Sequence, residues 1–316
     1  MSAASTGGRG NARRPALFER VNRGSSRTRS ALRQARQNLG AALAAASGRA
    51  EPWTWKRFHR EVRSSGRPLL ARLGQFPEAV LVAGCQRSGT TALARVIRRS
   101  EGFVDYAAPD RDDELDAALI LAGIERHAPR GRYCFQTTYL NERYGEYLDE
   151  RGEHQLVWVL RNPYSVVYSM LYNWEPFAFG ELFEACGYPL LEEQERRAYD
   201  RYGRLAVSKL RRACLAYAGK ELQALDLARA LGANRMLVAD YDLMVHDREA
   251  ALAEIYAFIR LPFKPHYADL IHARSLGKAD LLSAREKELI GETCGRIYEE
   301  LRALARAPGS RRSGVQ

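Results

Sequence analysis

The stretch AVLVAGCQRSGTT, residues 79–91, decides the fold of this chain. Its first six residues form a short apolar run, with the length and composition of a fully buried strand. A glycine-containing turn follows, and the sequence predicts a helix over residues 90–100. A strand, a glycine turn and a helix in this order indicate the α/β class, a parallel sheet flanked by helices.

The turn has the spacing of a phosphate-binding loop, because four residues separate Gly84 from Gly89. Glycines let the backbone wrap an anion, successive amides point inward, and the helix N-terminus adds partial positive charge. Nucleotide hydrolases place lysine directly after the second glycine, where Thr90 stands here, and the cation Arg87 lies inside the loop. We therefore expect an anion other than a magnesium-bound triphosphate. A plain turn that only joins strand to helix is the alternative.

The rest of the chain repeats this alternation of strand and helix. Further buried strands are predicted over residues 155–161 and 235–240, with a weaker candidate at 134–135. Helices are predicted to begin at Pro163, to cover 250–259, and to cover 283–304 with a serine cap. These patterns predict a P-loop-type parallel β-sheet flanked by helices.

The positive charge of the chain is concentrated at its N-terminus. The 316 residues carry a net charge of +11, but residues 1–50 hold ten arginines and one glutamate, which leaves the remainder nearly neutral. This distribution argues against a specific nucleic-acid-binding protein. We expect the tail to be disordered and solvated; an arm attracted to anionic lipid or polyphosphate is the alternative.

The remaining composition predicts the domain organisation and the compartment. We expect a helical lead-in over 51–77, one α/β domain over 78–304, and a flexible tail over 305–316. No apolar run approaches the roughly 18 residues that a membrane-spanning helix needs. The five cysteines are dispersed without a CxxC pair, so neither a zinc site nor a disulfide framework is indicated, and a cytoplasmic protein is expected.

A second motif, RNPYSVVYS, begins with Arg161 at the end of a predicted strand and ends with Ser169 on a predicted helix. Ligands in α/β sheets bind beyond the carboxyl ends of the strands, so Arg161 and Arg87 are expected to face one crevice. Arginine offers a planar pair of donors for phosphate, and the serine adds a neutral donor. A structural salt bridge is the alternative role for Arg161.

A third segment, YDLMVHD at 241–247, follows the strand predicted over 235–240. Together the three segments resemble the sulfotransferases that use 3′-phosphoadenosine 5′-phosphosulfate. RSGTT at 87–91 resembles the family's 5′-phosphosulfate loop, and R-x-P with serine eight residues after the arginine resembles its 3′-phosphate motif. The third segment is similar to the family's Y-E-D-L-V-x-D, and the resemblance spans about residues 78–304.

The resemblance implies transfer of a sulfuryl group from 3′-phosphoadenosine 5′-phosphosulfate to a hydroxyl or amine, without a metal. Arg87 would be catalytic. The residues that would bind the donor are Arg87, Ser88, Gly89, Thr90, Thr91, Arg161, Ser169, Tyr241, Gly277 and Lys278. Tyr241 would stack on adenine. The last two come from a loose match of RSLGK at 274–278 to the family's C-terminal phosphate-binding loop.

The catalytic base is the point where the sequence departs from part of the family. Cytosolic members carry Lys-Thr-His after the second strand, whereas this chain has QTT at 136–138. Members with an RSGTT-like loop use a carboxylate some eighteen residues beyond it. Asp110 is nearest in register and is predicted as the base, with Asp112 and Glu114 close behind. An acidic helix N-terminus, favoured by the helix dipole, is the alternative.

The acceptor stays open among carbohydrates, lipids, peptides and small alcohols. The aromatic segment 172–188 is either core packing or a lid over the acceptor. Two other functions remain as alternatives: a magnesium-dependent nucleoside or sugar kinase, and a non-enzymatic module that binds nucleotides or polyanions. The sequence does not predict an oligomeric state.

Overall fold

The computed structural model of the chain describes residues 51–107, 112–148, 154–271 and 277–305. The fold that follows is that of the unit Trp53–Gln316. The tails expected over 1–50 and over most of 305–316 lie outside the described residues.

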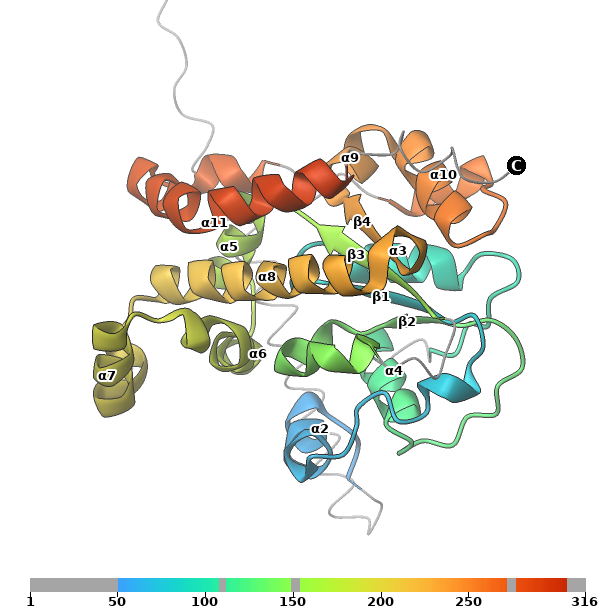
Figure 1. Cartoon of the computed structure of the whole chain (residues 1–316), viewed down its shortest axis with the longest axis horizontal. Helices are drawn as coiled ribbons and strands as arrows, with labels where there is room; N and C mark the ends of the chain where they lie inside the picture. Colours follow the sequence, from blue (N-terminus) through green and yellow to red (C-terminus); the bar gives the residue numbers. More distant parts are fainter. Residues whose placement is uncertain (1–50, 108–111, 149–153, 272–276, 306–316) are drawn as a thin grey trace, which may run out of the picture. The chain divides into compact units, whose positions relative to one another are not determined.

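Four parallel strands form one sheet in the order β2-β1-β3-β4 (Figure 1). Their bounds are β1 Val80–Gly84, β2 Cys134–Gln136, β3 Gln155–Leu160 and β4 Met236–Asp240. Every residue of these strands is buried, which is why each reads as a continuous apolar run. The α/β class and the four predicted strands, including the weak candidate at 134–135, are confirmed.

Helices connect and cover the strands. Their bounds are α2 Trp55–Glu61, α3 Thr90–Arg98, α4 Asp113–Leu121, α5 Pro163–Tyr172, α6 Pro176–Leu182, α7 Glu193–Tyr202, α8 Lys209–Arg235, α9 Tyr241–His246, α10 Arg248–Phe258 and α11 Ala284–Ala305. Three short helical turns matter for the site: η1 Arg63–Ser65, η4 Phe183–Gly187 and η9 Lys278–Leu281. The helices predicted to begin at residues 90, 163, 250 and 283 are confirmed to within two residues.

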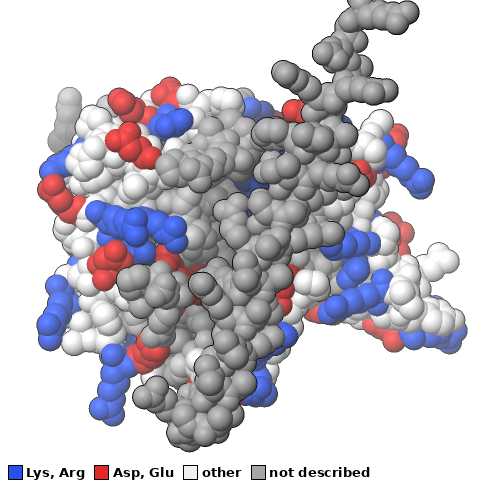
Figure 2. Space-filling model, turned by 180° about the vertical axis from the view of Figure 1, so that it is seen from behind, with Lys and Arg blue, Asp and Glu red and all other residues white. Residues whose placement is uncertain are grey.

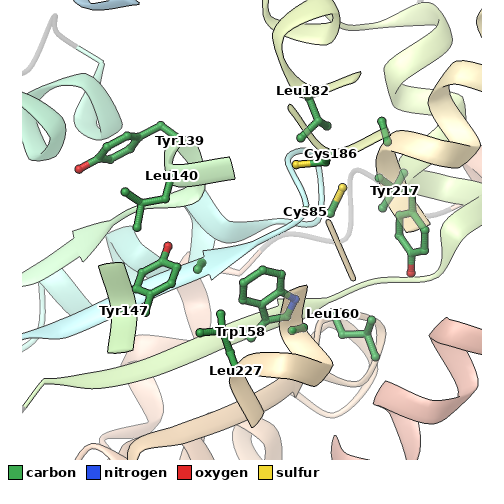
Figure 3. Close-up of a cluster of buried hydrophobic side chains, with 14 of the residues drawn as sticks. Cys85, Tyr139, Leu140, Tyr147, Trp158, Leu160, Leu182, Cys186, Tyr217 and Leu227 are labelled. Atoms are coloured by element: carbon green, nitrogen blue, oxygen red, sulfur yellow. The ribbon is translucent and has the colours of Figure 1, made fainter. Parts of the chain in front are cut away.

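Alternating strand residues fill two separate cores, one on each face of the sheet. Leu81 and Trp158 enter a core completed by α4, α5, α8 and α11. Val80 and Val157 enter the opposite core, completed by α3, α9 and α10. Figure 3 shows Trp158 among the side chains of the first core, which also include Cys85 and Cys186.

Helix α8 is a major element that the sequence motifs did not predict. It packs against β1, β3 and β4 and crosses the view in Figure 1 in front of the strands. Its residues from 212 to 221 are all buried, so this stretch shows no amphipathic alternation that would reveal it. The helix approaches η4 so closely that a Cβ atom on Gly219 would lie 1.9 Å from the carbonyl oxygen of Cys186.

The described surface carries both signs of charge. On the face shown in Figure 2, basic and acidic side chains are interspersed wherever described residues are visible. This mixture agrees with the near-zero net charge of the chain beyond residue 50. Within the described ranges no helix has the length and apolar character needed to cross a membrane.

The contact between α8 and η4 leads to a stability prediction. Alanine is normally the better helix former by about 1 kcal/mol, but Gly219→Ala should destabilise the protein by about 1–3 kcal/mol because the added methyl group meets backbone. Gly295→Ala in α11 is the matched control, since a Cβ there meets nothing within 4 Å and should stabilise slightly. Urea unfolding of both variants measures the difference. Equal free energies of unfolding would contradict the close approach.

Candidate functional site

The loop between β1 and α3 is built on three residues with positive φ. Gly84 has φ 146° and Gly89 has φ 100°, while Arg87, which is not a glycine, has φ 76°. A Cβ on Gly84 would lie 2.5 Å from the carbonyl oxygen of Val159, so β1 and β3 can approach this closely only with glycine there. Left-handed residues in such a loop turn backbone amides toward its inside, which makes a concave surface for an anion.

Two polar features of the loop are available for a ligand. Gly89 caps α3 without a side chain, so the first amides of this nine-residue helix receive no hydrogen bond from a capping side chain. The Ser88 hydroxyl is fully buried and has no hydrogen-bond partner among the described residues. Thr90 is buried and Thr91 is exposed. The loop therefore combines uncapped amides with a hydroxyl that can still donate.

The two predicted phosphate motifs meet directly. The Nε atom of Arg87 donates to the Ser169 hydroxyl at 2.9 Å, although 82 residues separate them along the chain. The guanidinium group of Arg161 donates to the carbonyl oxygen of Arg87 at 3.3 Å. The Asn162 side chain accepts from the Ser165 amide at 2.8 Å and so begins the helix that carries Ser169. The structure brings the predicted residues Arg87, Arg161 and Ser169 together.

Three cations crowd at this end of the sheet. Loss of hydration lowers the pKa of Arg87 and of Arg161, and the charge of Arg161 further lowers that of Arg87. Partial burial, together with the charges of Arg87 and Arg161, lowers the pKa of Lys278 to about 8. Lys278 begins η9, which packs against the helix of Ser169. Three mutually repelling cations create a strongly positive site, which an anion would stabilise.

Nearby acidic groups compensate this charge only in part. Asp242 lies 4.0 Å from the Nε atom of Arg161, and its carboxylate also accepts from the Asn162 backbone and side chain at 3.0 and 2.8 Å. Arg161 is 2 % exposed, whereas part of the Arg87 side chain is exposed even though its guanidinium group is largely enclosed and bonded to Ser169. An incoming anion can therefore reach the Arg87 side of the cluster.

Tyr241 supports the cluster from one side. Its ring contacts Gly89 so closely that a Cβ there would lie 2.2 Å from the ring, and the Arg161 guanidinium carbon lies 4.8 Å from the ring centroid. The residue is 5 % exposed. These contacts hold the loop and the arginine in place, and stacking of Tyr241 on adenine stays a prediction.

The acidic segment expected to supply the base separates into distinct roles. Asp110 lies outside the described residues. The Asp112 side chain caps α4, accepting from the amide of Glu114 at 3.1 Å, and also accepts from the Trp55 indole at 3.3 Å. Asp113 accepts from Arg98 at 3.0 Å, within a salt bridge. These contacts fit the reading of Asp112 and Asp113 as structural residues at a helix N-terminus.

Glu114 points instead toward the segment that follows β2. Its carboxylate accepts from the Gln136 side chain at 3.1 Å and from the Thr138 hydroxyl, and the Gln136 amide group also lies 3.3 Å from the Thr90 hydroxyl. Enclosure of the carboxyl group and the neighbouring Asp112 raise the pKa of Glu114 to about 8. The QTT segment thus links this carboxyl to the phosphate-binding loop. By distance from the loop along the sequence, Asp110 ranks before Glu114. The structure distinguishes Glu114 from Asp112, because the Asp112 side chain caps α4.

The other predicted features lie nearby or in the core. Gly277 has φ 78° and caps η9. In the aromatic segment 172–188, Phe179 and Phe183 are buried, which matches core packing, while Trp174 is partly exposed. No group of three metal-binding side chains occurs among the residues that the structure describes.

The chain matches no family model and no curated protein. Its structure is similar to a sulfotransferase domain from the curacin biosynthetic pathway, with 15% identity over 72% of this chain and 98% of that one and a TM-score of 0.45. It is also similar to mouse sulfotransferase SULT7A1 complexed with PAP, with 16% identity, 76% and 94% coverage and a TM-score of 0.41. Sulfotransferase STF9 from Mycobacterium avium gives 12% identity, 75% and 79% coverage and a TM-score of 0.38. Likenesses this weak carry no weight for function.

The lowered pKa of Lys278 predicts how anion binding depends on pH. Because a bound phosphate favours the protonated amine, affinity for adenosine 3′,5′-bisphosphate should be full below pH 8 and fall as Lys278 loses its proton above it. Calorimetric titrations between pH 7 and 10 measure this dependence. Lys278→Arg should bind tightly across the range, and Lys278→Met weakly across it. A wild-type affinity that does not change with pH would contradict the placement of Lys278 at the site.

Proposed function

We propose that this protein is a sulfotransferase that moves a sulfuryl group from 3′-phosphoadenosine 5′-phosphosulfate to a hydroxyl or amine of an acceptor. The observation that carries the proposal is the contact between the RSGTT loop and the motif that begins at Arg161. Arg87 donates a hydrogen bond to the Ser169 hydroxyl, and Arg161 donates one to the Arg87 carbonyl. This arrangement gives one site with two sets of anion-binding residues, the loop with Arg87 and the pair Arg161 and Ser169. The donor has two separate phosphate groups that match these two sets.

Each end of the donor has a set of ligands in this proposal. The loop amides and the guanidinium group of Arg87 bind the 5′-phosphosulfate, at the N-terminus of α3. Arg161 and Ser169 bind the 3′-phosphate, with Lys278 contributing charge. The Ser169 oxygen accepts from Arg87, so the serine's own proton remains for donation to a phosphate oxygen.

The reaction is an in-line displacement at sulfur. The acceptor oxygen or nitrogen forms a bond to sulfur while the bond from sulfur to the bridging oxygen breaks, and negative charge grows on the leaving phosphate. In this proposal Arg87 and the loop amides stabilise that charge. The Thr90 hydroxyl lies at the first residue of α3, directly after the loop.

A base must take the acceptor's proton, because a hydroxyl is a weak nucleophile at neutral pH. We assign this role to Glu114, whose raised pKa and link to the loop through Gln136 suit general-base catalysis. Asp110, the residue nearest in register, lies outside the described residues and stays the alternative for this role. Asp112 and Asp113 have structural partners, whereas Glu114 faces the loop side.

A kinase is the competing enzyme class, and Thr90 in place of the loop lysine speaks against it. A module that only binds nucleotides is the non-enzymatic alternative. Calorimetry with adenosine 3′,5′-bisphosphate and with ATP–Mg separates them from the proposal. Tight binding of ATP–Mg with no response to the bisphosphate would favour the kinase, and binding of the bisphosphate without any transfer would favour the module.

Transfer itself is tested with the donor labelled in its sulfuryl group and a panel of carbohydrate, lipid, peptide and small-alcohol acceptors. Arg87→Ala should lower turnover by about 100-fold or more, because it removes a donor aimed at the leaving group. Its affinity for adenosine 3′,5′-bisphosphate should fall much less. Arg95→Ala is the control, since Arg95 is an exposed arginine on α3 that pairs with Asp113. Equal turnover in Arg87→Ala and the wild type would overturn the role of Arg87.

A further inference from the structure

A buried lysine lies behind the site and has no role in the mechanism described so far. Lys220 on α8 is 0 % exposed. Its ammonium group donates to the carbonyl oxygen of Thr138 at 3.1 Å and to the side-chain oxygen of Asn141 at 3.4 Å, and it lies 5.6 Å from the centroid of the Trp158 ring. Both hydrogen-bond acceptors are uncharged oxygens. Burying a charge in such surroundings is costly, so its presence calls for a physical reason.

The two acceptors of Lys220 lead directly to the site. Thr138, whose carbonyl accepts from Lys220, donates its hydroxyl to Glu114. The Asn141 side-chain oxygen, which accepts from Lys220, also accepts from the Gln86 amide group of the phosphate-binding loop at 2.9 Å. Gln86 donates to the Thr138 carbonyl as well, at 3.1 Å. One residue therefore separates Lys220 from the proposed base on one side and from the loop on the other.

The backbone of Asn141 shows that this arrangement is imposed by its surroundings. Asn141 has φ 46° and ψ −119°, a conformation that residues with a side chain rarely adopt. The side chain is fixed by donors from both Lys220 and Gln86. Strain of this kind persists where neighbouring groups over-determine a conformation, and it concentrates at functional sites.

We propose that Lys220 is a positioning residue for the proposed sulfuryl transfer: its buried ammonium group holds Thr138 and Asn141, and through them the Glu114 carboxyl group and the Gln86 side chain of the loop. The proposal rests on the proposed function for its catalytic meaning. The physical link between Lys220 and Glu114 is a property of the protein that can be measured without turnover.

Electrostatics supports the same link. Enclosure and Asp112 raise the pKa of Glu114, whereas the Thr138 hydroxyl and the charge of Lys220 lower it. Burial lowers the pKa of Lys220. The charged and titratable groups that shift the pKa of Lys220 come from several elements: Cys85 of the loop, Cys186 of η4, Arg63 of η1 and Glu114 of α4. Lys220 in turn lowers the pKa of Glu221 on α8. Of the two carboxyl groups, Glu221 accepts from the Trp158 indole at 2.8 Å, and Glu114 faces the loop.

The test is a carbon-13 NMR titration of the glutamate carboxyl groups in the full-length protein, with Glu114→Gln used to assign the Glu114 signal. In the wild type the signal should titrate near pH 8. In Lys220→Met the midpoint should rise by about one pH unit, because removal of a nearby cation disfavours the carboxylate. Lys209→Met is the matched control on the same helix, with an exposed lysine outside the network, and should leave the midpoint unchanged.

A second variant breaks the link from the other end. Thr138→Val removes the hydroxyl that donates to Glu114 but keeps the carbonyl that accepts from Lys220, so it should also raise the midpoint. It decides the question if Lys220→Met does not fold. An unchanged midpoint in Lys220→Met would overturn the proposal. If Lys220→Met does not fold, an unchanged midpoint in Thr138→Val would overturn it.

The pH dependence of turnover gives the catalytic readout. The acid limb of the turnover profile should move upward with the Glu114 midpoint in Lys220→Met, which is a loss of about tenfold at pH 7 that recovers at higher pH. Affinity for adenosine 3′,5′-bisphosphate should stay within a few-fold of the wild type. If the wild type transfers no sulfuryl group, the proposed function fails, while the NMR titration still decides the link between Lys220 and Glu114.

Discussion

Repulsion among Arg87, Arg161 and Lys278 is the constraint on which this site depends. Lost hydration lowers the pKa of all three groups. The charge of Arg161 further lowers the pKa of Arg87, and the charges of both arginines further lower that of Lys278. Holding such groups together is unfavourable in the empty protein. A bound polyanion attracts all three cations and offsets their mutual repulsion. The unfavourable charge of the empty site therefore contributes to the affinity for the anion.

The scaffold around the cations explains how they stay in place. Gly84 lets β1 approach β3, which sets the loop beside Arg161 at the carboxyl ends of two neighbouring strands. Tyr241 braces Gly89 and Arg161 from the β4 side. From the opposite core, the Tyr217 hydroxyl of α8 donates to the Arg161 carbonyl at 2.9 Å. Helix α8 thus supports the 3′-phosphate residues through Tyr217 and the proposed base through Lys220.

Much of the fold was predictable because buried parallel strands are continuous apolar runs with a glycine or polar residue at their ends. The meeting of Arg87 with Arg161 followed from the rule that ligands bind at the carboxyl ends of such strands. Helix α8 was not predictable in this way, since its central stretch is buried on all sides and lacks an amphipathic period. The path from Lys220 through Thr138 to Glu114 joins segments far apart in sequence, and no local pattern encodes it. Register alone also could not show that Asp112 would be used as a helix cap.

The central claim is that Arg161 and Ser169 recognise one phosphate of a nucleotide while the loop recognises the other. The most direct measurement compares calorimetric affinities of Arg161→Ala and wild type for adenosine 3′,5′-bisphosphate and adenosine 5′-monophosphate. A charge-assisted contact is worth about 1.5–3 kcal/mol, so the variant should lose about 10- to 150-fold in bisphosphate affinity and little in monophosphate affinity. An equal loss of affinity for both nucleotides would contradict this claim and would assign Arg161 a structural role in the fold.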